Sequence, residues 1–194
     1  DDLFLFLFMN KIILASQSPR RKQLLEWAEV PFEIVAKPTD ETYPPGLAPE
    51  EVAIHIARQK ALAVQQGVPG GSVILAADTI VVLGQKIFGK PKDREDGIAI
   101  LTALSGNEHR VITGVVIMKD GKEKSFSDST SVKFHELSRK EIEFYIDKYK
   151  PYDKAGAYAI QEWIGVVGIQ SVTGDFYNVM GLPVSRVVRA LKDV

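Results

Sequence analysis

The segment "ILASQSPRR", residues 13–21, combines an apolar run with side chains that suit phosphate binding. Ser18 is a favoured N-cap residue and the proline after it a favoured first helical residue, so a helix should begin directly after a short strand. The unpaired N–H groups of such a helix start attract anions, and the guanidinium groups of Arg20 and Arg21 match phosphate oxygens. With Ser16, this segment indicates a phosphate site; a capped helix with two solvated arginines is the alternative.

An aspartate interrupts the apolar, β-branched segment "SVILAADTIVVL", residues 72–83. A carboxylate among such neighbours is costly unless it is paired or bound to a metal ion. Asp78 is therefore a candidate to hold a divalent cation or to polarise a water molecule, and the alternative is an aspartate that caps a loop. Lys90, in the turn "GKP", could bring an ammonium group to the same place, although a turn lysine is usually only solvated.

Glu41, in a proline-rich loop, and Lys60, in the helical pattern "ARQKA", complete a balanced set of charges. With Asp78 and Lys90 they would provide two acids for a metal ion and two cations for phosphates. Phosphoryl transfer needs this combination, because metal ions and ammonium groups stabilise the developing negative charge. Their separation along the chain does not show whether they converge.

The segment "DKAGAYAIQ", residues 153–161, has the composition of a loop that could contact a nucleotide. A glycine allows a close approach of the backbone, and Lys154, Tyr158 and Gln161 offer a cation, an aromatic face and an amide. An amide can read a base edge because it donates and accepts hydrogen bonds at once. A loop packed with small residues is the alternative.

Composition excludes several classes of function. The chain of 194 residues has no cysteine, which rules out disulfides, thiolate metal sites and cysteine nucleophiles and fits a cytoplasmic protein. A formal net charge of −1 gives no general attraction to nucleic acids or anionic membranes. The three histidines show no metal-ligand spacing, and no stretch is long enough to span a bilayer. We expect no nucleic-acid or membrane partner.

The pattern of elements predicts an α/β fold with a mixed twisted sheet, flanking helices and two lobes around a cleft. Residues 1–8, an acidic and apolar stretch before Met9, are expected to be a non-native or upstream extension, which leaves a single domain over residues 9–194. The expected strands are 11–16, 32–36, 72–83, 110–118, 124–134 and 166–172, and the expected helices are 19–28, 50–66, 93–104, 138–149 and one from 183.

Five motifs in order resemble those of the Maf family of nucleoside triphosphate pyrophosphatases: "LASQSPRRKQLL", "AADTIVVLGQKIFGKPKD", "LSGNEHRVITGV", "DKAGAYAIQ" and "GDFYNVMGLPV". The resemblance implies a fold related to the inosine triphosphatase type. It also implies hydrolysis of a nucleoside triphosphate to the monophosphate and pyrophosphate, with a divalent cation (Mg²⁺ or Mn²⁺) and a homodimeric state. By their place in the motifs, the residues that correspond to site positions are Asp78, Arg20, Thr79, Gln161, Ser16, Arg21, Glu41, Lys60 and Lys90.

The resemblance also implies roles for these residues. Asp78 corresponds to the family's proton acceptor, and Glu41 with Asp78 would hold the metal ion. Arg20, Thr79 and Gln161 correspond to positions of substrate choice and resemble the branch that prefers dTTP and UTP. Glu162 and the tryptophan after it depart from relatives that have a glycine after the glutamine; this leaves the assignment to the dTTP/UTP branch intact and the fine base preference open.

Two other interpretations stay open at this stage. One is a Maf enzyme that prefers 7-methyl-GTP or a broader set of pyrimidine nucleotides. The other is a nucleotide-binding regulatory module of cell division without significant turnover. The set of acids and lysines favours an enzyme, because a sensor has no need of a carboxylate that activates water.

Overall fold

The computed structural model describes residues 5 and 11–194 of the chain, which divide into two compact units. The first unit holds the described part of residues 1–78 with residues 113–128 and 181–194, and the second holds residues 79–112 and 129–180. The prediction of an extension over residues 1–8 and of a start at Met9 lies outside the described residues, apart from Leu5.

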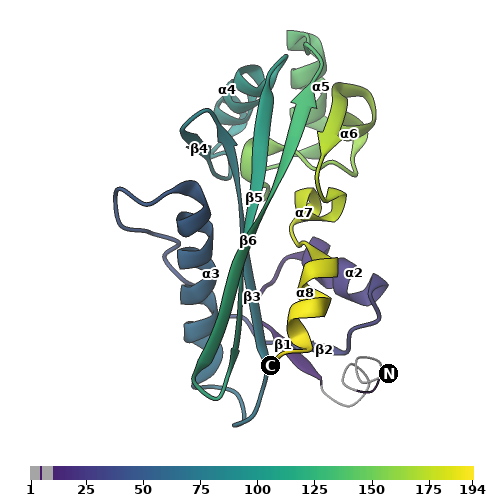
Figure 1. Ribbon diagram of the computed structural model, residues 1–194. Helices are drawn as coiled ribbons and strands as arrows, with labels where there is room; N and C mark the ends of the chain where they lie inside the picture. Colours follow the sequence, from purple (N-terminus) through teal and green to yellow (C-terminus); the bar gives the residue numbers. More distant parts are fainter. Residues whose placement is uncertain (1–4, 6–10) are drawn as a thin grey trace. The chain divides into compact units, whose positions relative to one another are not determined.

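The sheet of the described chain is mixed, as predicted, and contains seven strands (Figure 1). Its order is β2-β1-β3-β5-β6-β7, and β4 pairs with β3. Strand β1 is parallel to β2 and to β3, whereas β3–β4 and β6–β7 are antiparallel. The strands are β1 (Ile12–Leu14), β2 (Phe32–Ile34), β3 (Ile74–Leu83), β4 (Lys86–Phe88), β5 (Glu108–Lys119), β6 (Lys122–Phe134) and β7 (Ile169–Thr173).

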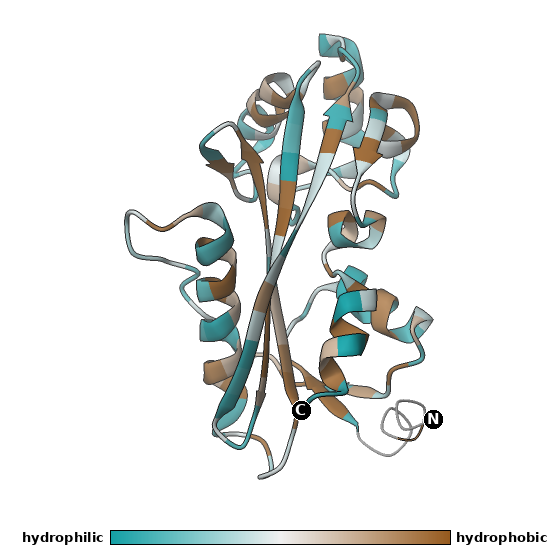
Figure 2. Ribbon diagram, in the orientation of Figure 1, coloured by the Kyte–Doolittle hydropathy of each residue, from teal (hydrophilic) through white to brown (hydrophobic). Residues whose placement is uncertain are grey.

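The first unit contains helices α2 (Pro19–Trp27), α3 (Pro49–Gln65) and α8 (Val184–Leu191). Figure 1 draws α3 on one side of the strands and α2 and α8 on the other. Hydrophilic and hydrophobic residues alternate along the ribbon of α3, as expected of a helix with one buried face (Figure 2). That face and the strands form a core cluster of Ile13, Ala15, Ala57, Ala61, Val64, Ile74, Ala76, Val116 and Met118.

A close approach between α3 and β5 depends on a glycine. A Cβ atom at Gly114 would lie 2.3 Å from the carbonyl carbon of Ala53 and 2.3 Å from the backbone nitrogen of Ile54. Backbone atoms cannot yield as a flexible side chain can, so no other residue fits here without moving the helix. The contact fixes the distance of α3, which carries Lys60, from the sheet.

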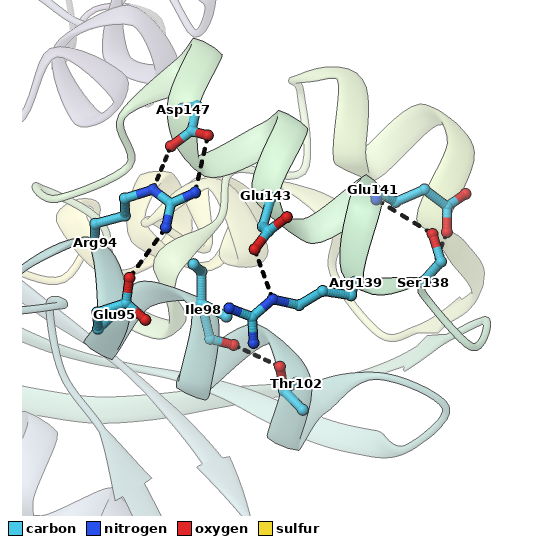
Figure 3. Close-up of polar contacts among 9 residues, drawn as sticks. All are labelled: Arg94, Glu95, Ile98, Thr102, Ser138, Arg139, Glu141, Glu143 and Asp147. Atoms are coloured by element: carbon cyan, nitrogen blue, oxygen red, sulfur yellow. Dashed lines mark hydrogen bonds and ion pairs between the residues drawn. The ribbon is translucent and has the colours of Figure 1, made fainter.

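The second unit contains α4 (Arg94–Leu104), α5 (Arg139–Tyr149), α6 (Trp163–Gly168), α7 (Phe176–Met180) and a short 3₁₀ helix, η1 (Ala155–Ala157). Helix α4 packs against α5 at Gly97, where a Cβ atom would lie 2.9 Å from Cδ1 of Ile146. Figure 3 shows the polar contacts around this pair of helices, among them Arg94 Nε to Asp147 Oδ1 at 2.7 Å. It also shows the predicted N-terminal start of α5, where Glu141 N donates to Ser138 Oγ at 3.2 Å.

The predicted strand over residues 166–172 is wrong in its first half. Residues Trp163–Gly168 form α6, and the strand β7 begins at Ile169. A short apolar run does not distinguish a strand from a helix, and here tertiary packing decides. Gly165 N donates to Glu162 O at 2.9 Å, and a Cβ atom at Gly165 would lie 1.7 Å from Ile160 O. The glycine allows the chain to turn tightly against the preceding loop.

Candidate active site

The start of α2 lies directly after β1 and has the predicted cap. Ser18 has extended backbone angles and its Oγ accepts from Arg21 N at 3.4 Å, while proline occupies the first turn. Ser18 N in turn donates to Ser16 Oγ at 3.2 Å. The two serines therefore fix the path from strand to helix, and the Ser18 cap satisfies one N–H group of the first turn.

Arg21 is buried, although the sequence left open whether it was solvated. Its Nε donates to Gly181 O at 2.8 Å, and its Nη1 donates to Ser16 Oγ at 3.3 Å. Burial lowers the pKa of Arg21 to about 10; Asp78 opposes this shift, Arg20 adds to it, and Glu41 opposes it. The side chain still carries its charge at neutral pH, and its electrostatic neighbours are the acids and the arginine that the sequence singled out.

Lys60 lies between two carboxylates. Its Nζ is 2.9 Å from Asp78 Oδ1 and 3.1 Å from Glu41 Oε1. The Lys60 and Asp78 side chains are 16% and 12% exposed, and that of Glu41 is 43% exposed. The ion pair between Lys60 and Asp78 is therefore weakly screened by solvent. A charged group that enters or leaves the site interacts strongly with both side chains. We call Glu41, Lys60 and Asp78 the acid–lysine triad.

Different elements supply the triad. Asp78 comes from β3, where it is one of the few buried charged side chains, and Lys60 comes from α3. Glu41 comes from the loop between β2 and α3 and has a φ of +52°, a conformation that non-glycine residues rarely adopt. An unusual backbone at a charged residue of a site is a common sign that its position serves function.

The first unit thus brings together seven of the predicted site residues. They are linked by hydrogen bonds, ion pairs or direct electrostatic interaction, and they combine a helix start, two arginines, one lysine and two acids. The seven are Ser16, Ser18, Arg20, Arg21, Glu41, Lys60 and Asp78. Acids that can hold a cation beside cations that can hold phosphates give the balance required for phosphoryl transfer.

The carboxylates of Glu41 and Asp78 fit a metal ion that is bound by few protein ligands, such as Mg²⁺. Among residues 5 and 11–194, no group of three or more His, Cys, Asp and Glu side chains could hold a metal ion by itself. Mg²⁺ is usually bound by one or two carboxylates together with waters and substrate phosphates, not by a cage of protein ligands. Glu41 and Asp78, which meet at one ammonium group, supply two such carboxylates. The donor set therefore fits a cation that arrives with a phosphorylated substrate.

The other four predicted residues belong to the second unit. Thr79 follows Asp78 in β3, and Lys90, which is exposed, follows β4. Gly156 N donates to Gly89 O at 3.1 Å, which ties η1 to the residue before Lys90. Lys154 Nζ pairs with Asp153 Oδ1 at 3.0 Å and Glu162 Oε1 at 3.3 Å, whereas Gln161 is exposed.

The loop that carries Lys154 and Gln161 is anchored by His109 and Tyr145, which sequence reasoning missed, and by Tyr158, which was predicted to offer an aromatic face to a nucleotide and is buried instead. His109 Nε2 lies 2.6 Å from the hydroxyl of Tyr158, and both rings contact Phe134. Tyr145 is fully buried and its hydroxyl binds both Ala159 and Glu162. The sequence showed three scattered histidines and a tyrosine on a helix; no motif marks such anchors, because they are defined by contacts between distant segments.

Burial of His109 should make the stability of the protein depend on pH. Desolvation lowers the pKa of His109 from 6.5 to about 4, and no described residue is a hydrogen-bond partner of its Nδ1. Between these values the unfolded chain binds a proton that the folded chain does not, so stability is present above about pH 6.5 and falls as the pH drops towards 4. Down to pH 5 the loss is about 2 kcal/mol.

Urea unfolding at pH 7.5 and pH 5 measures this loss, with His109→Gln as the matched variant, because glutamine keeps a polar partner for Tyr158 and does not titrate. The free energy of unfolding of the wild type should fall by about 2 kcal/mol more than that of the variant over this interval. Parallel pH profiles of the two proteins would show that His109 is not the group responsible.

Comparisons with known proteins identify the family of this chain. The family model described as Maf-like protein matches residues 11–194. A relative from Cytophaga hutchinsonii is 52% identical over 93% of this chain and 83% of its own length, and relatives from Porphyromonas gingivalis (strain ATCC 33277) and Parabacteroides distasonis are each 48% identical over 94% of this chain and 94% and 95% of their own. Each of the three relatives is named dTTP/UTP pyrophosphatase.

Sequence identity to solved structures is lower than identity to these relatives. The Ham1 protein of Staphylococcus aureus covers 64% of this chain and 72% of its own, with 15% identity and a TM-score of 0.44. Among the described residues, no helix is long and apolar enough to cross a bilayer. The fold assignment depends on the mixed sheet and on the family match, which covers the whole of residues 11–194; this chain belongs to the Maf-like protein family.

Proposed function

We propose that this protein hydrolyses dTTP and UTP to the monophosphate and pyrophosphate. The observation that carries the proposal is the acid–lysine triad, in which Lys60 Nζ lies within 3.1 Å of both carboxylates. A site for binding alone has no need of two carboxylates beside a phosphate-binding helix start. The names of the relatives, which are 48–52% identical to this chain, support the choice of nucleotides.

In the proposed reaction a water molecule attacks the α-phosphorus of the nucleotide. The new O–P bond forms as the bond from the α-phosphorus to the bridging oxygen breaks, and pyrophosphate leaves. Asp78 accepts the proton of the attacking water. Lys60 shifts its hydrogen bonds from the carboxylates towards the phosphate oxygens, which stabilises the negative charge that builds up during the reaction.

The remaining residues of the first unit hold the phosphates and orient them. The backbone N–H and the guanidinium of Arg20 donate to phosphate oxygens, and Arg21, fixed by Gly181 and Ser16, contributes a charge that does not move. Glu41 and Asp78 are the residues that would hold Mg²⁺ or Mn²⁺. When bound, this ion would neutralise phosphate charge and lower the pKa of water.

For the second unit the proposal keeps the predicted roles. Lys90 adds a cation for the phosphates, and Thr79 and Gln161 select the base. Lys154 is kept as a substrate-binding cation, and its ion pairs with Asp153 and Glu162 hold it in the loop. The cytoplasmic location and the homodimeric state are also kept as predictions, and light scattering of the purified protein tests the second.

A substrate panel tests the proposed function. Purified protein is incubated with Mg²⁺ or Mn²⁺ and with dTTP, UTP, CTP, dCTP, GTP, 7-methyl-GTP or ITP, and ion-exchange chromatography separates the products. We expect monophosphate and pyrophosphate from dTTP and UTP. The same products from 7-methyl-GTP alone, or equally from all pyrimidine nucleotides, would keep the enzyme and reject the base preference. Binding of nucleotides without turnover would favour the regulatory module.

A further inference from the structure

In the second unit, Tyr145 and Glu162 make hydrogen bonds around Gln161 that we call the clamp. The proposed function gives these two residues no role in selecting the base. We propose that Tyr145 and Glu162 position Gln161 for reading the base, so that Glu162 is a specificity-determining positioning residue of this enzyme. The inference rests on the proposed function, in which Gln161 contacts the base.

Both hydrogen bonds of the clamp are made by one atom, the hydroxyl oxygen of Tyr145. The hydroxyl of Tyr145 accepts a hydrogen bond from Ala159 N at 3.1 Å and donates one to Glu162 Oε2 at 2.7 Å. Ala159 and Glu162 lie on either side of Gln161 in the chain. Tyr145 is fully buried in α5 and its ring stacks on Tyr149 with the centroids 5.1 Å apart, so the oxygen is a fixed point. Burial and the bond to Glu162 raise the pKa of Tyr145, which keeps the hydroxyl a donor.

Glu162 also ties this part of the loop to its beginning. Its Oε1 lies 3.3 Å from Nζ of Lys154, and the Lys154 side chain is only 12% exposed. An ion pair so shielded from solvent is screened little by salt. Both carboxylate oxygens of Glu162 therefore have a partner, one on a helix and one at the start of the loop.

Backbone contacts further restrict the conformation of the chain around Gln161. Glu162 N donates to Ala159 O at 3.1 Å, and Gly165 packs so closely on Ile160 O that a side chain there is excluded. Ala159 and Ile160 are buried, whereas Gln161 is exposed. The loop therefore holds its backbone rigid on both sides of one outward-facing amide.

A fixed amide can distinguish bases that a mobile amide cannot. Uracil and thymine present an acceptor at O4 and a donor at N3, whereas cytosine presents a donor at N4 and an acceptor at N3. A glutamine amide that is free to turn over satisfies either pattern, because its two ends differ only in donor and acceptor character. Selection of uracil or thymine therefore requires that the amide reach the base from one position, and the clamp restricts that position by fixing the backbone on both sides of Gln161.

The test compares Glu162→Ala with Glu162→Gln and with the control Glu143→Ala. Glu143 lies on α5 in the same unit and pairs with Arg139, so the control loses the same charge away from the loop (Figure 3). The measured quantity is kcat/KM for UTP divided by kcat/KM for CTP. We expect this ratio to fall about 10-fold in Glu162→Ala. It should stay within about 3-fold of the wild type in Glu162→Gln, whose amide oxygen still accepts from Tyr145, and in the control.

A second readout does not depend on turnover. Hydrogen exchange at the amide of Ala159 should become at least about 10-fold faster in Glu162→Ala and in Tyr145→Phe, since both changes disturb the bond to the hydroxyl. If Glu162→Ala does not fold, Glu162→Asp, whose shorter side chain cannot reach both partners, is judged by the same two measurements.

The outcomes separate the two claims. An unchanged UTP-to-CTP ratio in a folded Glu162→Ala variant, or an equal loss for both nucleotides, overturns the positioning role while the enzyme stands. Unchanged exchange at Ala159 overturns the clamp itself. A wild-type protein that hydrolyses none of the nucleotides overturns the proposed function, and the specificity role falls with it.

Discussion

Replacing Asp78 by asparagine should lower the turnover of dTTP and UTP at least about 100-fold while the protein stays folded. Asparagine has nearly the same shape and can still accept a hydrogen bond from Lys60, whose Nζ lies 2.9 Å from Asp78 Oδ1. It cannot take a proton from water, and it is a poor ligand for a divalent cation. The loss should therefore appear in kcat more than in KM.

Asp147→Asn is the matched control for this experiment. Asp147 is an exposed carboxylate on α5 that pairs with Arg94, so the control loses the same charge in a place that the proposed reaction does not use. Steady-state kinetics and a thermal melt of both variants complete the comparison. Turnover of Asp78→Asn within about 3-fold of the wild type would remove Asp78 from its role as proton acceptor.

Replacing Lys60 by methionine should also reduce turnover about 100-fold, because the ammonium group that faces the phosphates is lost. The variant should differ from Asp78→Asn in a second respect. Without the cation between them, the carboxylates of Glu41 and Asp78 repel each other and become a better site for Mn²⁺. Added without nucleotide, Mn²⁺ should raise the Tm of the variant more than that of the wild type.

Lys124→Met controls for the loss of one positive charge from the same unit. Lys124 is a partly exposed residue of β6 that pairs with Asp193, and its replacement should leave both turnover and the response to Mn²⁺ at the wild-type level. An equal response to Mn²⁺ in Lys60→Met and the wild type, together with full turnover, would show that Lys60 neither balances the carboxylates nor acts on the substrate.

Local signals in the sequence predicted most of the fold. Ser18 before a proline marked the start of α2, and Ser138 with Glu141 marked that of α5; both caps are present. Strand β3 was predicted from its β-branched run. Three short elements, β4, η1 and α7, were not predicted, because three to five residues carry too little periodicity to be recognised. Residues Trp163–Gly168 were read as strand because packing of Gly165 on Ile160, which decides the helix, is invisible in a local pattern.

Less of the candidate site than of the fold was predictable from the sequence, because many of its contacts join segments that lie far apart in the chain. Asp78 stood out because a carboxylate in an apolar strand needs a partner, and Lys60 is that partner. The burial of Arg21 was not predictable, since its acceptor, Gly181 O, lies at the far end of the chain. The same holds for Tyr145 and His109, whose partners belong to a distant loop. Side-chain chemistry can be read locally, whereas contacts between distant segments require the fold.

The hydrogen bond from Arg21 to Gly181 spans 160 residues of sequence and sets an order in time. A ribosome releases Gly181 only after 160 residues have followed Arg21. Until then the guanidinium lacks the Gly181 carbonyl, one of the groups that hold it. A chain cut short before Gly181 should therefore remain without a fully preorganised site for phosphates.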